Sequence, residues 1–183
     1  MNLANKITIS RILMIPVFIA LVLSREDFFQ YAALIVFLIA AITDTLDGYV
    51  ARKYDLVSDF GRFLDPLADK LLVTAALTAL VGMGRMSAWA MYIIIVREFS
   101  VTGLRLIAVN RGVVIGAGFL GKLKTVVQIV VVSYGMAPFY KDIDNIFKGY
   151  SLLDILVFLM VFITVASGVE YIYRHRALLM GDK

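Results

Sequence analysis

Strongly apolar segments alternate with short polar ones along the chain. Six of them reach the roughly 20 residues that a helix needs to cross a bilayer. Their approximate bounds are 7–24, 31–51, 60–82, 87–109, 119–137 and 151–173. The segments between them carry charged or helix-breaking residues, such as SRED at 24–27 and PFYKDIDN at 138–145. The pattern predicts an all-α, polytopic membrane protein with six transmembrane helices. We expect residues 1–183 to form one domain and the opening MNLANK to lie along the membrane surface.

Composition supports the membrane reading and excludes several kinds of site. The hydrophobic fraction is 61%, against about 45–50% in soluble domains. The sequence has no cysteine, so disulfides and thiolate metal sites are excluded. The one histidine, His175, stands between Arg174 and Arg176 near the C-terminus and is interpreted as tail charge. The net charge of +4 comes from basic residues that flank apolar runs. It therefore indicates anionic lipid and membrane orientation rather than nucleic acid.

Lys and Arg are distributed unequally between the two ends of the predicted helices. With the N-terminus inside, thirteen lie at inner ends, four in outer loops, and Arg97 lies in mid-span. The inner set is Lys6, Arg11, Arg52, Lys53, Arg62, Lys70, Arg105, Arg111, Lys122, Lys124, Arg174, Arg176 and Lys183. The outer set is Arg25, Arg85, Lys141 and Lys148. The positive-inside rule then predicts a multi-pass protein with both termini in the cytoplasm.

Four aspartates stand at the inner ends of the second and third predicted helices. Asp44 and Asp47 are three residues apart in DTLDGYVAR and share a helix face. Asp65 and Asp69 are four apart in GRFLDPLAD and also share a face. The two helices are consecutive and hence antiparallel neighbours, so the four carboxylates are predicted to converge. Solvated loop charges would not require these matching faces.

Converging carboxylates in a low-dielectric site need protonation or cations to offset their charge. An all-oxygen set without His or Cys suits Mg²⁺, Mn²⁺ or Ca²⁺, and four carboxylates suffice for two such ions. Two-ion sites are a recurring solution for displacement at phosphorus. Gly48, Ala51 and Gly61 lie on the same faces and either admit a large ligand or let the helices pack closely. Arg52 either binds phosphate or marks the inner membrane edge.

Together these residues form the pattern Asp44-x2-Asp47-Gly48-x2-Ala51-Arg52-x8-Gly61-x3-Asp65-x3-Asp69. The pattern resembles the full signature of the CDP-alcohol phosphatidyltransferase family, with no departure at a fixed position. The resemblance implies transfer of a phosphatidyl group from CDP-diacylglycerol to an alcohol with release of CMP. It also implies two divalent cations, Mg²⁺ or Mn²⁺, on the four aspartates. Asp69 would in addition be the general base, and the CDP contacts would be Gly48, Ala51, Arg52 and Gly61.

Basic residues in the second half bear on the acceptor alcohol. Arg97 and Arg105 lie on one face of REFSVTGLRLIAVNRG, and Arg111, Lys122 and Lys124 follow at the predicted inner level. Arg and Lys are the residue types that hold phosphate, so an acceptor that carries a phosphate is favoured over serine or choline. The alternative for each cation is membrane orientation. For Arg97 it is a structural pair with Glu98 or another helix.

The stretches REFSVTGLRL, GKLKT and NKITISRILMIPVF are similar to a branch of the family, the bacterial phosphatidylglycerophosphate synthases. The resemblance implies sn-glycerol 3-phosphate as acceptor, a bacterial cytoplasmic membrane location with the active site on the cytoplasmic side, and a homodimer. Another phosphorylated acceptor, such as inositol phosphate, is the alternative within the family. From a different class, a divalent-cation transporter would use intramembrane acids. Such a transporter would more often show two similar halves, and the second half has no repeat of DxxDG.

Overall fold

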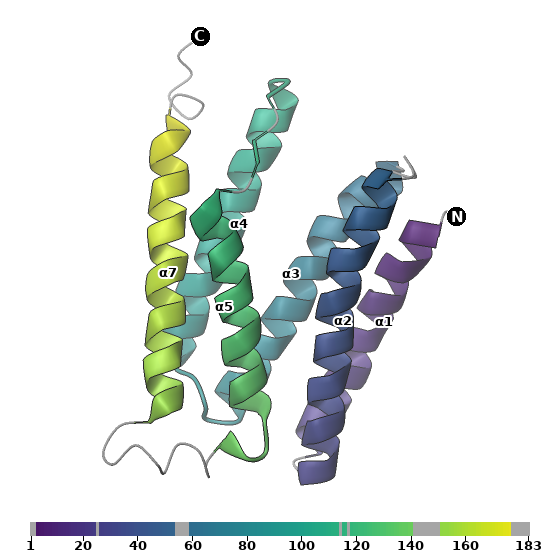
Figure 1. The fold of residues 1–183 in the computed structure, drawn as a ribbon, viewed down its shortest axis with the longest axis vertical. Coiled ribbons are helices and arrows are strands. Elements are labelled where there is room, and N and C mark those ends of the chain that lie inside the picture. The colour runs from purple at the N-terminus through teal and green to yellow at the C-terminus, as the bar shows by residue number, and fades with distance from the viewer. Residues whose placement is uncertain are drawn as a thin grey trace. The chain divides into compact units, whose positions relative to one another are not determined.

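The computed structural model describes residues 3–24, 26–53, 59–113, 115–116, 118–140 and 151–176. Side chains are described in these ranges except at 3–6, 44–63, 65–66 and 110. This part of the chain contains six α-helices and no strand: α1 (Leu3–Leu23), α2 (Asp27–Lys53), α3 (Asp59–Gly82), α4 (Ala88–Asn110), α5 (Phe119–Met136) and α7 (Leu152–Arg174) (Figure 1). One helix matches each predicted segment, with ends that differ by a few residues. The all-α prediction is therefore confirmed.

The helices belong to two compact units. Unit 1 comprises Met1–Arg85 and Val132–Ile143, and unit 2 comprises Met86–Val131 and Asp144–Lys183. In unit 1, α1 packs against both α2 and α3. The rings of Phe18 and Phe37 meet there at 6.3 Å between centroids and are fully buried. In unit 2, α4 packs against α7, and each unit has buried apolar side chains of its own.

Long apolar helices carry much of the described surface. By length and composition, α5 and α7 are able to cross a membrane, and Ile7–Leu23 and Asp27–Thr43 form shorter apolar stretches. Large apolar side chains stand exposed on several helices, among them Phe28 at 75%, Phe158 at 73% and Leu13 at 66%. Exposed apolar surface on this scale is typical of a membrane protein, because in water it would favour aggregation.

A tight turn joins α3 to α4 in the segment Met83–Ser87. Gly84 adopts a φ of 68°, a left-handed conformation that favours glycine. Ser87 then caps α4, its hydroxyl accepting from the backbone N–H of Trp89 at 3.1 Å. Between them, the Arg85 guanidinium donates to the backbone oxygen of Gly135 at 2.9 Å and to Gln30 at 3.0 Å. It also lies 4.3 Å from the centre of the Tyr140 ring, so one side chain ties three segments of unit 1 together.

Candidate active site

The residues of the aspartate signature lie on two antiparallel helices of unit 1. Asp44, Asp47, Gly48, Ala51 and Arg52 fall in the last turns of α2, and Gly61, Asp65 and Asp69 fall in the first turns of α3. The last turns of α2 and the first turns of α3 lie at the same end of unit 1 (Figure 1). The predicted helix placement of the signature is thus confirmed. Apart from Asp69, the side chains of these residues lie outside the described part of the chain.

Asp69 is the signature carboxylate whose surroundings the structure describes. Its Oδ2 accepts a hydrogen bond from the ammonium of Lys70 at 2.7 Å. The Asp69 side chain is 39% exposed, and that of Lys70 is 19% exposed. A small polar molecule therefore has access to this carboxylate, while the neighbouring lysine limits the rotation of the group.

The donor chemistry of the signature fits divalent cations. It supplies carboxylate oxygens alone, the donors that Mg²⁺ and Mn²⁺ prefer. Their spacing puts two acids on the α2 face and two on the α3 face, at the adjoining ends of consecutive helices. Among the described side chains, no group of three or more His, Asp or Glu forms a competing metal site.

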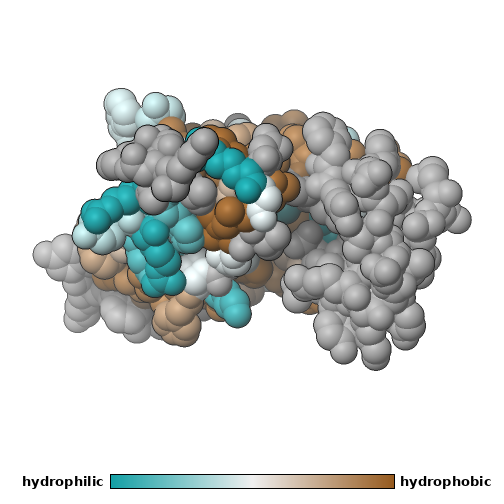
Figure 2. All heavy atoms as spheres, turned by 90° about the horizontal axis from the view of Figure 1, so that it is seen from above, coloured by the Kyte–Doolittle hydropathy of each residue, from teal (hydrophilic) through white to brown (hydrophobic). Residues whose placement is uncertain are grey.

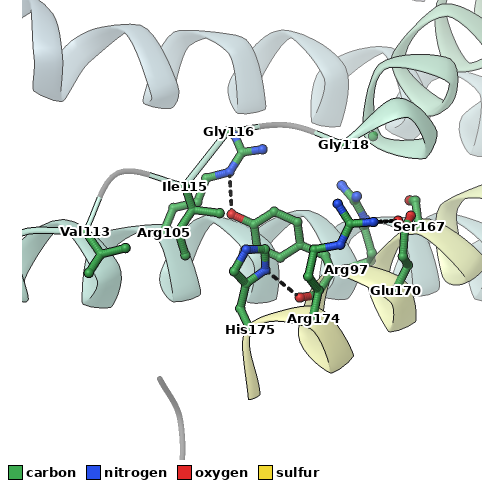
Figure 3. A pocket seen from close by; sticks show the side chains of 12 residues that line it. Arg97, Arg105, Val113, Ile115, Gly116, Gly118, Ser167, Glu170, Arg174 and His175 are labelled. Carbon is green, nitrogen blue, oxygen red and sulfur yellow. Dashed lines mark hydrogen bonds and ion pairs between the residues drawn. The ribbon is translucent and has the colours of Figure 1, made fainter. Parts of the chain in front are cut away.

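Unit 2 contains a cavity of about 380 Å³ between its helices and the segment before α5 (Figure 3). The polar part of its wall comes from α4 and from the C-terminal half of α7 with the residue after it. The complete lining is Arg97, Arg105, Val113, Ile115, Gly116, Gly118, Gly121, Ser167, Glu170, Tyr171, Arg174 and His175. Figure 2 shows unit 2 from the end at which the C-terminal half of α7 lies, and hydrophilic side chains gather there. Three arginines against one glutamate make the wall cationic.

Arg97 and Lys124 meet at one buried carboxylate. Glu98, next to Arg97 on α4, is 4% exposed. Its Oε1 accepts from Arg97 Nη1 at 3.1 Å and from Lys124 Nζ of α5 at 2.5 Å. Lys124 is itself buried, with 6% of its surface exposed, and is not part of the cavity wall. A structural pair of Arg97 with Glu98, one of the sequence interpretations, is therefore present, and Arg97 also lines the cavity.

Arg105 is held by α7. Its Nε donates to the Tyr171 hydroxyl at 3.1 Å, and its guanidinium carbon lies 5.4 Å from the centre of that ring. The Tyr171 ring packs in turn against the His175 ring at 4.7 Å, and His175 Nδ1 lies 2.9 Å from the Tyr171 backbone oxygen. One turn away, Arg174 donates to Glu170 at 2.7 Å. Figure 3 shows these groups around one opening.

The structure separates the five cations that the sequence grouped as candidate phosphate ligands. Arg97 and Arg105 line the cavity, Lys124 lies behind its wall, and Arg111 and Lys122 are exposed outside the lining. The sequence interpretation did not include the α7 side of the wall. It treated His175 as tail charge and counted Arg174 among the cations at the inner helix ends. The signal was the spacing on one helix face: Tyr171 follows Ser167 by four residues, and Arg174 and His175 follow Tyr171 by three and four.

Comparison with known proteins identifies the family of the chain. Residues 1–167 match the sequence profile of the family described as CDP-alcohol phosphatidyltransferase. A CDP-diacylglycerol–glycerol-3-phosphate 3-phosphatidyltransferase from Bacillus subtilis is 44% identical over 95% of this chain and 95% of its own. A probable phosphatidylglycerophosphate synthase from Mycobacterium tuberculosis is 36% identical over 94% of this chain and 81% of its own. A Rickettsia typhi protein with the same description as the Bacillus one is 35% identical, covering 93% and 94%.

Proposed function

Since the chain belongs to the CDP-alcohol phosphatidyltransferase family, we propose that it transfers the phosphatidyl group of CDP-diacylglycerol to sn-glycerol 3-phosphate, giving phosphatidylglycerol phosphate and CMP. The observation that carries this proposal is the 44% identity with the Bacillus subtilis enzyme over 95% of both chains. The complete aspartate signature supports the reaction type, and the cationic cavity of unit 2 supports a phosphorylated acceptor. The direct test is CMP release by the purified protein with CDP-diacylglycerol and a panel of alcohols. Faster turnover with inositol phosphate than with glycerol 3-phosphate would assign a different acceptor.

We assign the donor half of the reaction to the signature of α2 and α3. Asp44, Asp47, Asp65 and Asp69 would hold two divalent cations. When bound, these ions neutralise the diphosphate of the donor and stabilise the departing CMP. The CDP contacts proposed from the signature are Gly48, Ala51, Arg52 and Gly61.

Asp69 has the second role of general base. It accepts the proton of the acceptor hydroxyl while the hydroxyl oxygen bonds to the phosphorus of the phosphatidyl group and the bond to CMP breaks. Its partial exposure and its contact with Lys70 support this role, because the carboxylate is accessible and held in one orientation.

We assign the phosphate of the acceptor to the cavity of unit 2. Arg97 and Arg105 are the members of the predicted set that line it, and Arg174 extends the cationic wall. Guanidinium groups suit a phosphate because they present several donors in a planar fork. Arg111, Lys122 and Lys124 stay predicted acceptor residues, with no place in the described lining.

Replacing Arg105 with Ala should raise the KM for glycerol 3-phosphate by about one to two decades, because a charge-assisted hydrogen bond contributes roughly 1.5–3 kcal/mol. The KM for CDP-diacylglycerol should change much less. Steady-state titration of each substrate separately measures both constants. Arg176→Ala is the matched control, since Arg176 is exposed, stacks on Tyr173 at 4.6 Å and lies outside the cavity lining. If only the KM for CDP-diacylglycerol rises, Arg105 belongs to the CDP-diacylglycerol site instead.

We further propose six membrane spans formed by one domain, with MNLANK at the membrane surface and both termini in the bacterial cytoplasm. A homodimer is proposed from the family resemblance. The support for the orientation is the thirteen-to-four distribution of Lys and Arg. The active site would then face the cytoplasm, where glycerol 3-phosphate is dissolved.

Cysteine labelling tests the orientation without background, because the native chain has no cysteine. Single cysteines at positions 55 and 183 should be protected from an impermeant thiol reagent in intact cells and should react after the cells are opened. A cysteine at position 141, in a predicted outer loop, serves as the control and should react in intact cells. Labelling of 55 or 183 in intact cells would reverse the proposed orientation.

A further inference from the structure

We propose that Glu98 and Gly168 are positioning residues that hold Arg97 in the cavity wall, and that Lys124 acts through Glu98 by offsetting its charge. The inference rests on the proposed function. It assigns a role to Glu98 and Gly168, which the sequence analysis did not connect with the acceptor, and an indirect role to Lys124. It concerns how the cationic wall is built, and Arg97 remains the group that meets the phosphate.

The first observation is the arrangement of charge around Glu98. Two cations contact the same buried oxygen, from the neighbouring residue Arg97 and from Lys124 on α5. The exposed fractions of the three side chains are 12% for Arg97, 5% for Glu98 and 7% for Lys124. A buried Arg–Glu pair alone would be neutral and a poor partner for an anion. With Lys124 the three side chains together carry one net positive charge, and Arg97 is the member that lines the cavity.

The second observation is the close approach of Arg97 to the α7 backbone. A Cβ built on the buried Gly168 would lie 2.8 Å from Arg97 Cγ, 3.6 Å from Nε and 3.8 Å from Cδ. The collision involves the stem of the side chain, so an added methyl group would displace the guanidinium as well. Gly168 also follows Ser167, which lines the cavity. Glu98 therefore fixes Arg97 from α4, and the absence of a side chain at Gly168 gives its stem room against α7.

A third observation points to a ligand. Arg97 Nε is buried and has no hydrogen-bond partner among the described residues. A buried donor without an acceptor costs free energy. A phosphate oxygen bound against Arg97 is a group that would supply this acceptor, and the fixed position of the guanidinium prepares it for that contact.

Replacing Glu98 with Gln tests the positioning role, because the two explanations predict opposite changes in the KM for glycerol 3-phosphate. If Glu98 only lowered the positive potential, its neutralisation would tighten binding of the acceptor. Positioning predicts the opposite: the KM for glycerol 3-phosphate should rise by about tenfold or more, with kcat and the donor KM changed by less than about twofold. Glu98→Asp keeps the charge and should recover part of the loss. Lys124→Met should also raise the acceptor KM, since Arg97 and Glu98 then form a neutral pair.

Replacing Gly168 with Ala tests the close approach, and the chain offers a matched control. Gly103→Ala makes the same change inside α4 of the same unit, where a new Cβ meets nothing within 4 Å. Gly168→Ala should raise the acceptor KM by about fivefold, whereas Gly103→Ala should keep the parent value. Melting temperatures and donor KM values establish that each variant is folded. If Gly168→Ala does not accumulate, the Glu98 series decides the question.

The outcomes separate this inference from the proposed function. If the parent releases CMP with glycerol 3-phosphate while Glu98→Gln and Gly168→Ala keep the parent acceptor KM, positioning of Arg97 is overturned and the activity stands. A fall in the acceptor KM of Glu98→Gln also overturns it. If the parent releases no CMP with any alcohol, the proposed function fails. Stabilisation of the purified parent by glycerol 3-phosphate, lost in both variants, would then still support the positioning of Arg97.

Discussion

Chelation with EDTA should reduce CMP release by the purified protein to background, and added Mg²⁺ or Mn²⁺ should restore it. The reason is the donor set of α2 and α3. Four carboxylates at adjoining helix ends repel one another and the diphosphate of the donor, unless cations neutralise both. Divalent ions contribute several kcal/mol of transition-state stabilisation at such sites, so their loss leaves almost no measurable rate. The measurement is CMP release at fixed substrate concentrations across a titration of free metal.

Two controls sharpen this result. EDTA that is saturated with Mg²⁺ beforehand should leave the rate unchanged, which separates chelation from an effect of the chelator on detergent or lipid. Asp44→Ala, Asp47→Ala and Asp65→Ala should each shift the half-maximal metal concentration upward as well as lower the rate. Full turnover of the parent in metal-free buffer would contradict the two-ion proposal.

Asp69→Asn should lower kcat by about 10²–10⁴-fold, the usual contribution of general-base catalysis, while retaining more metal affinity than the three alanine variants. The amide keeps the shape and one oxygen donor but accepts no proton from the acceptor hydroxyl. The rate at saturating metal and substrates measures the loss, and the metal titration measures retention. Asp154→Asn is the matched control, because Asp154 is an exposed aspartate in the first turn of α7. A rate for Asp69→Asn close to that of the parent would place the base elsewhere.

The helices were predictable because each apolar segment is long and is bounded by charge or helix breakers. The bounds of α4 and α5 differ from the predicted ones by at most one residue, since a capping serine, glycines or a proline stand close to their ends. The placement of the aspartate signature at the end of α2 and the start of α3 was likewise predictable, because it depends only on where the apolar segments begin and end. In both cases the information is local in the sequence.

The wall of the cavity was less predictable because it depends on contacts between distant segments. Periodicity places Arg97 and Arg105 on one face of α4, but it does not show which residues face them. Glu98 meets a lysine 26 positions later, and Arg105 meets a tyrosine 66 positions later. Gly168 offered no chemical signal at all, because its contribution is the absence of a side chain where Arg97 passes. Such contacts follow from tertiary packing, which a single sequence does not encode in a readable pattern.

Arg85 shows that hydrogen-bond geometry and membrane orientation make conflicting demands on one residue. It is one of the four cations on the proposed outer side, where the positive-inside rule disfavours a charge. Its two terminal nitrogens reach different segments while its plane covers an aromatic ring, an arrangement that a lysine ammonium does not reproduce. The turn requires the planar guanidinium group for these contacts, and the positive charge is a consequence of that requirement. Arg85 thus subtracts from the orientation signal for a structural reason, and the bias among the remaining cations is stronger than thirteen to four.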